Sequence, residues 1–253
     1  MSKPDRAIVA HEDWISARKA LLEKEKAFSR QRDELTRLRQ QMPWEPVEKD
    51  YQFDSELGTL SLRDLFFGCT QLVIYHFMFE QDWQEGCKSC SFITDHLDPS
   101  LMHLAARDVS LVLVSAAPID TLLAFRKRML WRTPWVSSGN SEFNRDYQVQ
   151  FTPEEIANNR VYYNYREGTT FPSTEGPGIS TFALDEEENI YHTYSAYQRG
   201  LENFIGAYTV LDIVPNGRNE ENLTYGMEWL RLKDRYDELD YVDPYAEKLR
   251  AKR

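Results

Sequence analysis

Two apolar stretches constrain the fold of this chain more than any other feature. Residues 72–79 (LVIYHFMF) and residues 109–115 (VSLVLVS) are nearly continuous apolar runs of strand length. Such runs are typical of strands that are buried on both faces of a sheet. Between them, residues 88–106 place apolar side chains at helical spacing, which predicts a helix. This order of elements favours an α/β fold, a sheet flanked by helices.

The rest of the pattern continues this fold. Residues 119–130 predict a second helix, and residues 179–184 and 190–194 predict a β-hairpin around an acidic turn. The stretch 131–178 is less regular, so we expect an insertion before the C-terminal hairpin. Residues 198–210 predict the last helix of the core.

The two ends of the chain differ in composition from the middle. Residues 11–41 are mostly charged, with a narrow apolar stripe, and predict one long helix. We therefore expect three parts: an N-terminal helical extension over 1–46, a domain over 47–215, and a polar C-terminal tail over 216–253 with a helical patch near 227–236. The narrow stripe suits packing on the domain and a homodimer contact equally well.

The charge balance excludes some classes of partner. The chain has 41 acidic and 30 basic residues and a net charge of −11, which argues against nucleic acid or an anionic membrane as a partner.

No apolar run reaches the roughly 18 residues of a membrane helix, and the first residues lack a secretory pattern. With three cysteines and no export signal, we expect a cytoplasmic protein without a disulfide framework.

Two of the three cysteines stand together, and their setting predicts redox chemistry. Cys87 and Cys90 follow the first apolar strand and a loop, at the start of the predicted helix. A helix N-terminus stabilises a thiolate, and Lys88 adds a positive charge beside it. Residues three apart on a helix lie on one side, within reach of a disulfide. We expect Cys87 to attack and Cys90 to resolve. Cys69, far from the pair, is expected to be a buried apolar residue.

Two other interpretations of the cysteine pair stay open. A structural zinc site needs four ligands, usually in two close pairs, and no second C-x-x-C or H-x-x-x-H is present. We therefore expect neither a metal nor a cofactor, although a metal at His76 or His192 would suit a non-redox enzyme. Alternatively, both cysteines are small buried residues of a helix.

Several segments around the pair resemble the DUF899 family. They are YHFMFEQDWQEGCKSCSF (75–92), LAARDVSLVLVSAAP (104–118), PWVSS (134–138), FNRDY (143–147) and YHTYSAYQRG (191–200). They occur in the family's order and extend the likeness over residues 10–215. The resemblance implies a thioredoxin-like sheet with an N-terminal helical extension. It also implies a dithiol–disulfide oxidoreductase whose redox-active pair is Cys87 and Cys90.

The sequence departs from thioredoxin itself. The cysteines enclose Lys88-Ser89 instead of Gly-Pro, and Pro177 stands slightly early for the proline that thioredoxins place beside the dithiol. With no acidic residue at the expected place, His76 is a candidate proton acceptor for Cys90. The peroxiredoxin pattern P-x-x-x-T-x-x-C does not fit, because Glu80 and Gln84 replace its proline and threonine.

Further residues are candidates for a pocket near the cysteines. Trp83 precedes the pair, and His192, Tyr194 and Arg199 lie at or just after the end of the last predicted strand. Trp135, Ser137, Asn144 and Asp146 lie in the segments shared with DUF899 and are candidates for the same pocket. Packing without chemistry explains each of these residues equally well.

The sequence therefore supports a first hypothesis and two alternatives. The first is a thiol–disulfide oxidoreductase that acts on a disulfide-containing protein or small molecule and is reset by an external reductant. The second is a thioredoxin-like binding or accessory module in which the cysteines are incidental. The third is a metabolite-modifying enzyme without dithiol turnover.

Overall fold

The computed structural model describes residues 6–169 and 171–237, and the chain divides into two compact units, Met1–Pro43 and Trp44–Arg253. The first unit contains the predicted long helix, α1 (His11–Gln40). No residue of α1 is buried, and Trp14, Phe28 and Leu38 are each more than half exposed. Glu45 and Pro46, which the sequence places in the extension, belong to the second unit because they pair with its sheet.

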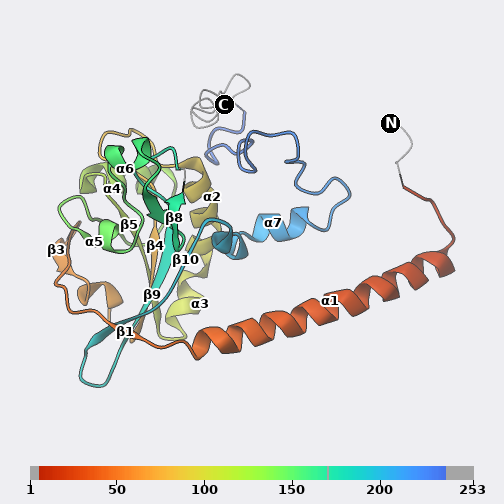
Figure 1. Cartoon of the computed structure of the whole chain (residues 1–253), viewed down its shortest axis with the longest axis horizontal. Coiled ribbons are helices and arrows are strands. Elements are labelled where there is room, and N and C mark those ends of the chain that lie inside the picture. Colours follow the sequence, from red (N-terminus) through yellow and green to blue (C-terminus); the bar gives the residue numbers. More distant parts are fainter. Residues whose placement is uncertain (1–5, 170, 238–253) are drawn as a thin grey trace. The chain divides into compact units, whose positions relative to one another are not determined.

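The second unit is built on an eight-stranded sheet with the strand order β1-β10-β9-β4-β5-β6-β2-β3. Strands β4, β5 and β6 are parallel, and β9 runs antiparallel to β4, so the apolar runs of the sequence form the centre of the sheet (Figure 1). The strands are β1 (Glu45–Pro46), β2 (Gln52–Ser55), β3 (Gly58–Ser61), β4 (Gln71–His76), β5 (Val109–Ser115), β6 (Trp135–Ser137), β9 (Gly178–Leu184) and β10 (Ile190–Tyr197). A separate pair consists of β7 (Val161–Tyr163) and β8 (Arg166–Thr169).

Helices and turns cover both faces of this sheet. They are η1 (Asp64–Phe66), α2 (Lys88–Leu97), η2 (Asp98–Ser100), α3 (Leu101–Ala105), α4 (Ile119–Arg128), α5 (Phe143–Asp146), α6 (Pro153–Ala157), η3 (Gln198–Phe204) and α7 (Gly206–Leu211). A parallel strand–helix–strand unit followed by an antiparallel hairpin, with helices on both faces, is the thioredoxin-like α/β fold that the family resemblance implies.

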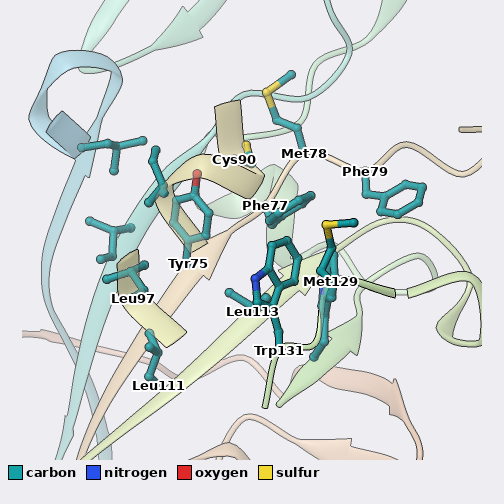
Figure 2. Close-up of a cluster of buried hydrophobic side chains, with 14 of the residues drawn as sticks. Tyr75, Phe77, Met78, Phe79, Cys90, Leu97, Leu111, Leu113, Met129 and Trp131 are labelled. Atoms are coloured by element: carbon teal, nitrogen blue, oxygen red, sulfur yellow. The ribbon is translucent and has the colours of Figure 1, made fainter. Parts of the chain in front are cut away.

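Each face of the sheet has its own hydrophobic cluster. On the cysteine face, Tyr75, Leu111 and Leu113 pack with α2 and α4, as Figure 2 shows for part of the cluster. On the opposite face, here called the histidine face, Leu72, Ile74, Val112 and Val114 pack with η1 and α5. Because successive side chains of a strand alternate, β4 sends Tyr75 to the first face and His76 to the second.

The structure confirms the main predicted elements and corrects several limits. The predicted helix over 88–106 is three elements, since Pro99 cannot donate the next helical hydrogen bond. The predicted helix over 198–210 is the 3-10 helix η3 followed by α7. The region 131–178 is not wholly an insertion, because β6 belongs to the central sheet.

The polar end of the chain is more than a tail in its described part. No helix forms near 227–236; turns occupy this stretch instead. Leu230 and Leu232 are buried, and Leu232 belongs to the cluster of the cysteine face. Cys69, expected to be buried, is only half-buried. None of the described helices combines the length and apolar character that crossing a membrane requires.

Candidate functional site

The start of α2 holds Cys87 at its N-cap and Cys90 one turn later. The chain enters the helix through Gly86, where a Cβ atom would lie 2.6 Å from Cε1 of Phe77, so only glycine fits without a shift. The Cys87 amide donates to the Met78 carbonyl (3.1 Å), and the Ser91 amide donates to the Cys87 carbonyl (2.8 Å). These contacts fix both cysteines at the carboxyl end of β4.

The surroundings of Cys87 favour its thiolate form. The Cys90 thiol is the largest contribution; together with the amide groups of Cys90 and Ser89 and the charge of Lys88, it lowers the pKa of Cys87 to about 7. Burial acts in the opposite direction and is overcome. Cys87 is half-buried and Cys90 is buried, and both are free thiols. This is the asymmetry expected of an attacking and a resolving cysteine.

Tyr75, on β4, is the third side chain of the site beside Cys87 and Cys90. Its side chain is fully buried, and its hydroxyl points toward the helix turn that carries Cys90 (Figure 2). The hydroxyl makes no hydrogen bond of ordinary geometry, yet it lies close enough to favour the Cys90 thiolate. Burial nonetheless raises the pKa of Cys90 above that of an ordinary thiol, and burial also raises the pKa of Tyr75. At neutral pH, Tyr75 and Cys90 both keep their protons.

Both cysteines and Tyr75 line a cavity of about 1010 Å³. Its walls come from the loop 83–86, the start of α2, the stretch 171–173, η3, and the segment 208–227. Aromatic and apolar residues in these walls include Met78, Trp83, Ile93, Tyr163, Phe171, Leu201, Tyr208, Tyr225 and Met227. A mostly apolar cavity with a few convergent polar groups is what small-molecule sites in proteins have in common.

The C-terminal segment is bound to both α2 and α4. Lys88 Nζ donates to the Glu228 carbonyl (2.6 Å), and Arg128 Nε contacts Asp234 (2.7 Å). Within the segment, the side chains of Tyr208 and Trp229 both donate to Glu220 Oε1, at 2.8 and 2.6 Å. The described end of the chain is therefore part of the site.

Three of the predicted site residues border this cavity beside the cysteines. Trp83 lies in its loop wall, Lys88 at the start of α2, and Arg199 on η3. Lys88 is buried, whereas the Arg199 side chain is 88% exposed and pairs with Glu202 at 3.0 Å. Pro177, which the sequence places slightly early, also lines the cavity just before β9.

His76 does not reach the cysteines. Its Nε2 atom is 2.8 Å from Ser180 Oγ, and its ring stacks on Phe143 and Tyr147 of the histidine face. Burial lowers the pKa of His76 to about 3. The expectation that His76 accepts the Cys90 proton is therefore wrong, because strand alternation turns it away and Tyr75 takes that position.

A β-bulge separates the other predicted pocket residues. In a regular strand, His192 and Tyr194 would share a face, but the register shifts between them. His192 Nε2 contacts Ser195 Oγ (2.7 Å), and its ring packs on Tyr147 of the histidine face. Tyr194 packs against the hydrophobic cluster of the cysteine face without lining the cavity.

The shared segments 134–138 and 143–147 also lie away from the cavity. Trp135 is buried in the cysteine-face cluster and donates to Ser115 Oγ (3.0 Å). Ser137, at the end of β6, and Asn144, on α5, are buried as well. Asp146 accepts hydrogen bonds from Lys49 and Tyr51 at the surface. None of the four borders the cavity.

Sequence reasoning missed other members of the site. Phe171, Tyr163 and the segment 208–227 come to the cysteines from stretches that have no motif. A buried carboxyl group outside the cavity wall was missed as well: the Glu175 Oε2 atom accepts from the Phe79 amide (2.8 Å), just beyond the carboxyl end of β4. Burial raises the pKa of Glu175 to about 8, so this carboxyl group is mostly protonated at neutral pH.

Across residues 6–169 and 171–237, no group of three or more His, Cys, Asp or Glu side chains is arranged to hold a metal ion. His76 and His192 are linked through Ser180 and Ser195 in a chain of hydrogen bonds at 2.8, 2.8 and 2.7 Å.

Comparison with known proteins places the chain among its relatives. Solved structures with a similar fold include peroxidoxin BcpB from Mycobacterium tuberculosis, with 12% identity, 66% of this chain and 97% of that chain covered, and a TM-score of 0.44. Peroxiredoxin Q from Xanthomonas campestris shows 15% identity, 67% and 97% coverage, and a TM-score of 0.43. Likenesses this distant carry no information about chemistry. No curated protein matches.

The family comparison covers far more of the chain. The profile described as "Bacterial protein of unknown function (DUF899)" matches residues 3–236, which include the cysteine helix, the sheet and the segment that lines the cavity. The chain belongs to the DUF899 family, and within it has the thioredoxin-like fold with a long N-terminal helix.

Proposed function

We propose that the protein is a thiol–disulfide oxidoreductase that uses Cys87 and Cys90. The observation that carries this proposal is the pair's position: Cys87 at a helix N-terminus with a pKa of about 7, Cys90 one turn later, and both on the wall of a cavity. At pH 7 roughly half of the Cys87 population is thiolate, which is the nucleophilic form. Cys90 stays protonated until it attacks the mixed disulfide in the second step.

The proposed cycle has two steps that balance. The Cys87 thiolate attacks one sulfur of a substrate disulfide, R–S–S–R, forming Cys87–S–S–R and releasing one thiolate that takes a proton from solvent. Cys90 then loses its proton and attacks the Cys87 sulfur, which releases the second thiolate. The substrate gains two electrons and two protons, and the protein keeps a Cys87–Cys90 disulfide. An external dithiol reductant restores the two thiols.

Tyr75 is proposed to assist the second step. Cys90 is buried, so its thiolate is costly unless a donor compensates it. The Tyr75 hydroxyl points toward the cysteine helix and has no ordinary partner of its own (Figure 2). A hydrogen bond from this hydroxyl lowers the free energy of the Cys90 thiolate at the moment of attack.

The test uses single substitutions of each cysteine. Reduced protein is mixed with a test disulfide, and disulfide formation is followed by alkylation and mass spectrometry. Cys87→Ser is expected to lose turnover, whereas Cys90→Ser is expected to accumulate a mixed disulfide at Cys87. Cys69→Ser is the matched control, because Cys69 lies outside the cavity and should not change the rate. If Cys87→Ser reduces the test disulfide at the parental rate, the cysteines are incidental and a binding module is the better description.

A further inference from the structure

The composition of the cavity wall points to a class of substrate. We infer that the cavity takes a small, uncharged and largely apolar or aromatic disulfide, not a disulfide within a protein; this inference rests on the proposed function. The cavity volume of about 1010 Å³ lies at the upper end of the range for small-molecule sites. Four observations about its walls carry the inference.

First, aromatic and apolar side chains surround the thiols. Trp83, Phe171 and Met227 come from three separate stretches of the chain, and all are part of the cavity wall. All three also pack against the cluster that contains Cys90. A phenyl or alkyl group bound among them leaves water, and burial of apolar surface is the main source of affinity in such a site.

Second, the carboxylates of the wall already have cationic or donor partners. Glu202 accepts from Arg199 (3.0 Å) and from Arg218 (2.9 Å). Glu220 accepts from Tyr208 and Trp229, and Arg218 stacks on the Tyr208 ring at 3.8 Å.

Third, the basic groups of the wall are engaged as well. Arg218 also binds Asp212 at 2.7 Å, and Lys88 donates to the Glu228 carbonyl. The positive charge of Lys88 acts on the Cys87 thiolate, and a charged substrate would lose its hydration while the arginines and carboxylates of the wall are already paired. The wall therefore discriminates against anionic and cationic substrates.

Fourth, the sheet offers no place for a peptide beside the dithiol. An extended peptide docks most readily by adding to an exposed strand edge. β4, which leads to the cysteines, is hydrogen-bonded to β5 on one edge and to β9 on the other, and β9 is bonded to β4 and β10. Within the described sheet, both strands are therefore closed to a peptide backbone.

The reaction follows the cycle given above, with R an uncharged apolar group. One R–S group binds against the aromatic wall and stays on Cys87 as the mixed disulfide, while the other leaves as a thiolate. Attack by Cys90 breaks the Cys87–S–S–R bond and releases the bound group as the second thiolate. The two electrons come from the Cys87/Cys90 pair, which an added dithiol such as dithiothreitol reduces again.

The experiment compares three disulfides with the full-length reduced protein. They are dibenzyl disulfide, its analogue with a carboxylate on each ring, and the disulfides of insulin. The rate of Cys87–Cys90 disulfide formation is divided by the rate at which free dithiothreitol reduces the same compound, which removes intrinsic reactivity. We expect the normalised rate for dibenzyl disulfide to exceed the other two by about 30-fold, the factor expected from burying one aromatic group.

A pair of variants tests the wall itself. Met227→Glu places a charge in the cavity, and Met102→Glu places the same charge on α3, where Met102 is 68% exposed and outside the cavity. Met227→Glu should slow the reaction with dibenzyl disulfide by about tenfold. Met102→Glu should leave it unchanged, and both variants should unfold in one cooperative transition in urea, which shows that they are folded.

The outcomes separate the two proposals. If insulin or the dicarboxylate reacts as fast as dibenzyl disulfide, the substrate class is wrong and the oxidoreductase stands. If none of the compounds oxidises the pair, the proposed function fails. If an aromatic hydroperoxide oxidises the pair faster than every disulfide, redox chemistry stands and a disulfide is not the substrate.

Discussion

Both faces of the central sheet carry polar and ionisable side chains, but the surroundings of these side chains differ between the two faces. On the cysteine face, Tyr75 and the two thiols border a cavity. On the histidine face, His76, Ser180 and Ser195 are sealed off from the cavity and joined by hydrogen bonds, and the His76 ring stacks on Phe143, although its Nδ1 atom makes no hydrogen bond. The difference comes from one step along β4, which places Tyr75 and His76 on opposite sides. We therefore expect substitutions of polar groups at the cavity to change the rate of disulfide exchange. Substitutions of buried polar groups away from the cavity should change the free energy of unfolding.

Glu175 should give the largest effect among the buried polar groups that do not border the cavity. Burial raises its pKa from 4.5 to about 8, so the folded state binds a proton that the unfolded state has lost between these values. Stability therefore falls as pH rises from about 4.5 to 8, by on the order of 4–5 kcal/mol in total. Glu175→Gln keeps the shape and the acceptor for the Phe79 amide but cannot ionise.

The measurement is urea unfolding of both proteins at pH 5 and pH 9. Wild type should lose more stability between these values than Glu175→Gln, while the rate of disulfide reduction at neutral pH stays similar in both. Equal losses would show that this carboxyl group ionises without cost and is not sealed.

Substitutions at adjacent positions of β4 compare the two faces directly. Tyr75→Phe removes only the hydroxyl that points toward the cysteine helix, and should slow closure of the Cys87–Cys90 disulfide by about 10- to 100-fold, the range for a lost hydrogen bond to a charged group. His76→Gln should leave that rate within a factor of about two, because the residue makes no contact with the cavity. It should instead lower stability, since it disturbs the bond to Ser180.

Stopped-flow mixing of the Cys87 mixed disulfide separates closure from the first attack. If His76→Gln closed the Cys87–Cys90 disulfide slowly and Tyr75→Phe closed it at the wild-type rate, the roles assigned to the two faces would be exchanged. Urea unfolding of the same variants checks that the change in rate is not caused by loss of folded protein.

Much of the fold could be predicted because its signals are local. The apolar run 109–115 is a strand with the same limits, and the sequence Thr152-Pro153-Glu154-Glu155 forms a capping box at the start of α6. The helix 11–41 forms as α1, ending one residue earlier. In each case the residues that specify the element lie within it.

The site was less predictable because most of it is assembled from distant residues. The helix N-terminus at Cys87 follows from neighbouring residues, and the structure has it there. The bulge that turns His192 away from Tyr194 has no marker residue in the strand. The segment 208–227 reaches the cavity through contacts such as that between Lys88 and Glu228, which join residues 140 positions apart. Composition alone made the chain from residue 216 onward look like a polar tail.

The central claim is that the start of α2 holds Cys87 as a thiolate, and titration of its reactivity tests this most directly. The alkylation rate of Cys87 by iodoacetamide is measured against pH in wild type and in Lys88→Met, with modification at Cys87 resolved from Cys69 and Cys90 by mass spectrometry. The rate in wild type should reach half its maximum near pH 7, and Lys88→Met should move this midpoint upward. A wild-type midpoint at the ordinary thiol value of about 8.5 would contradict the account.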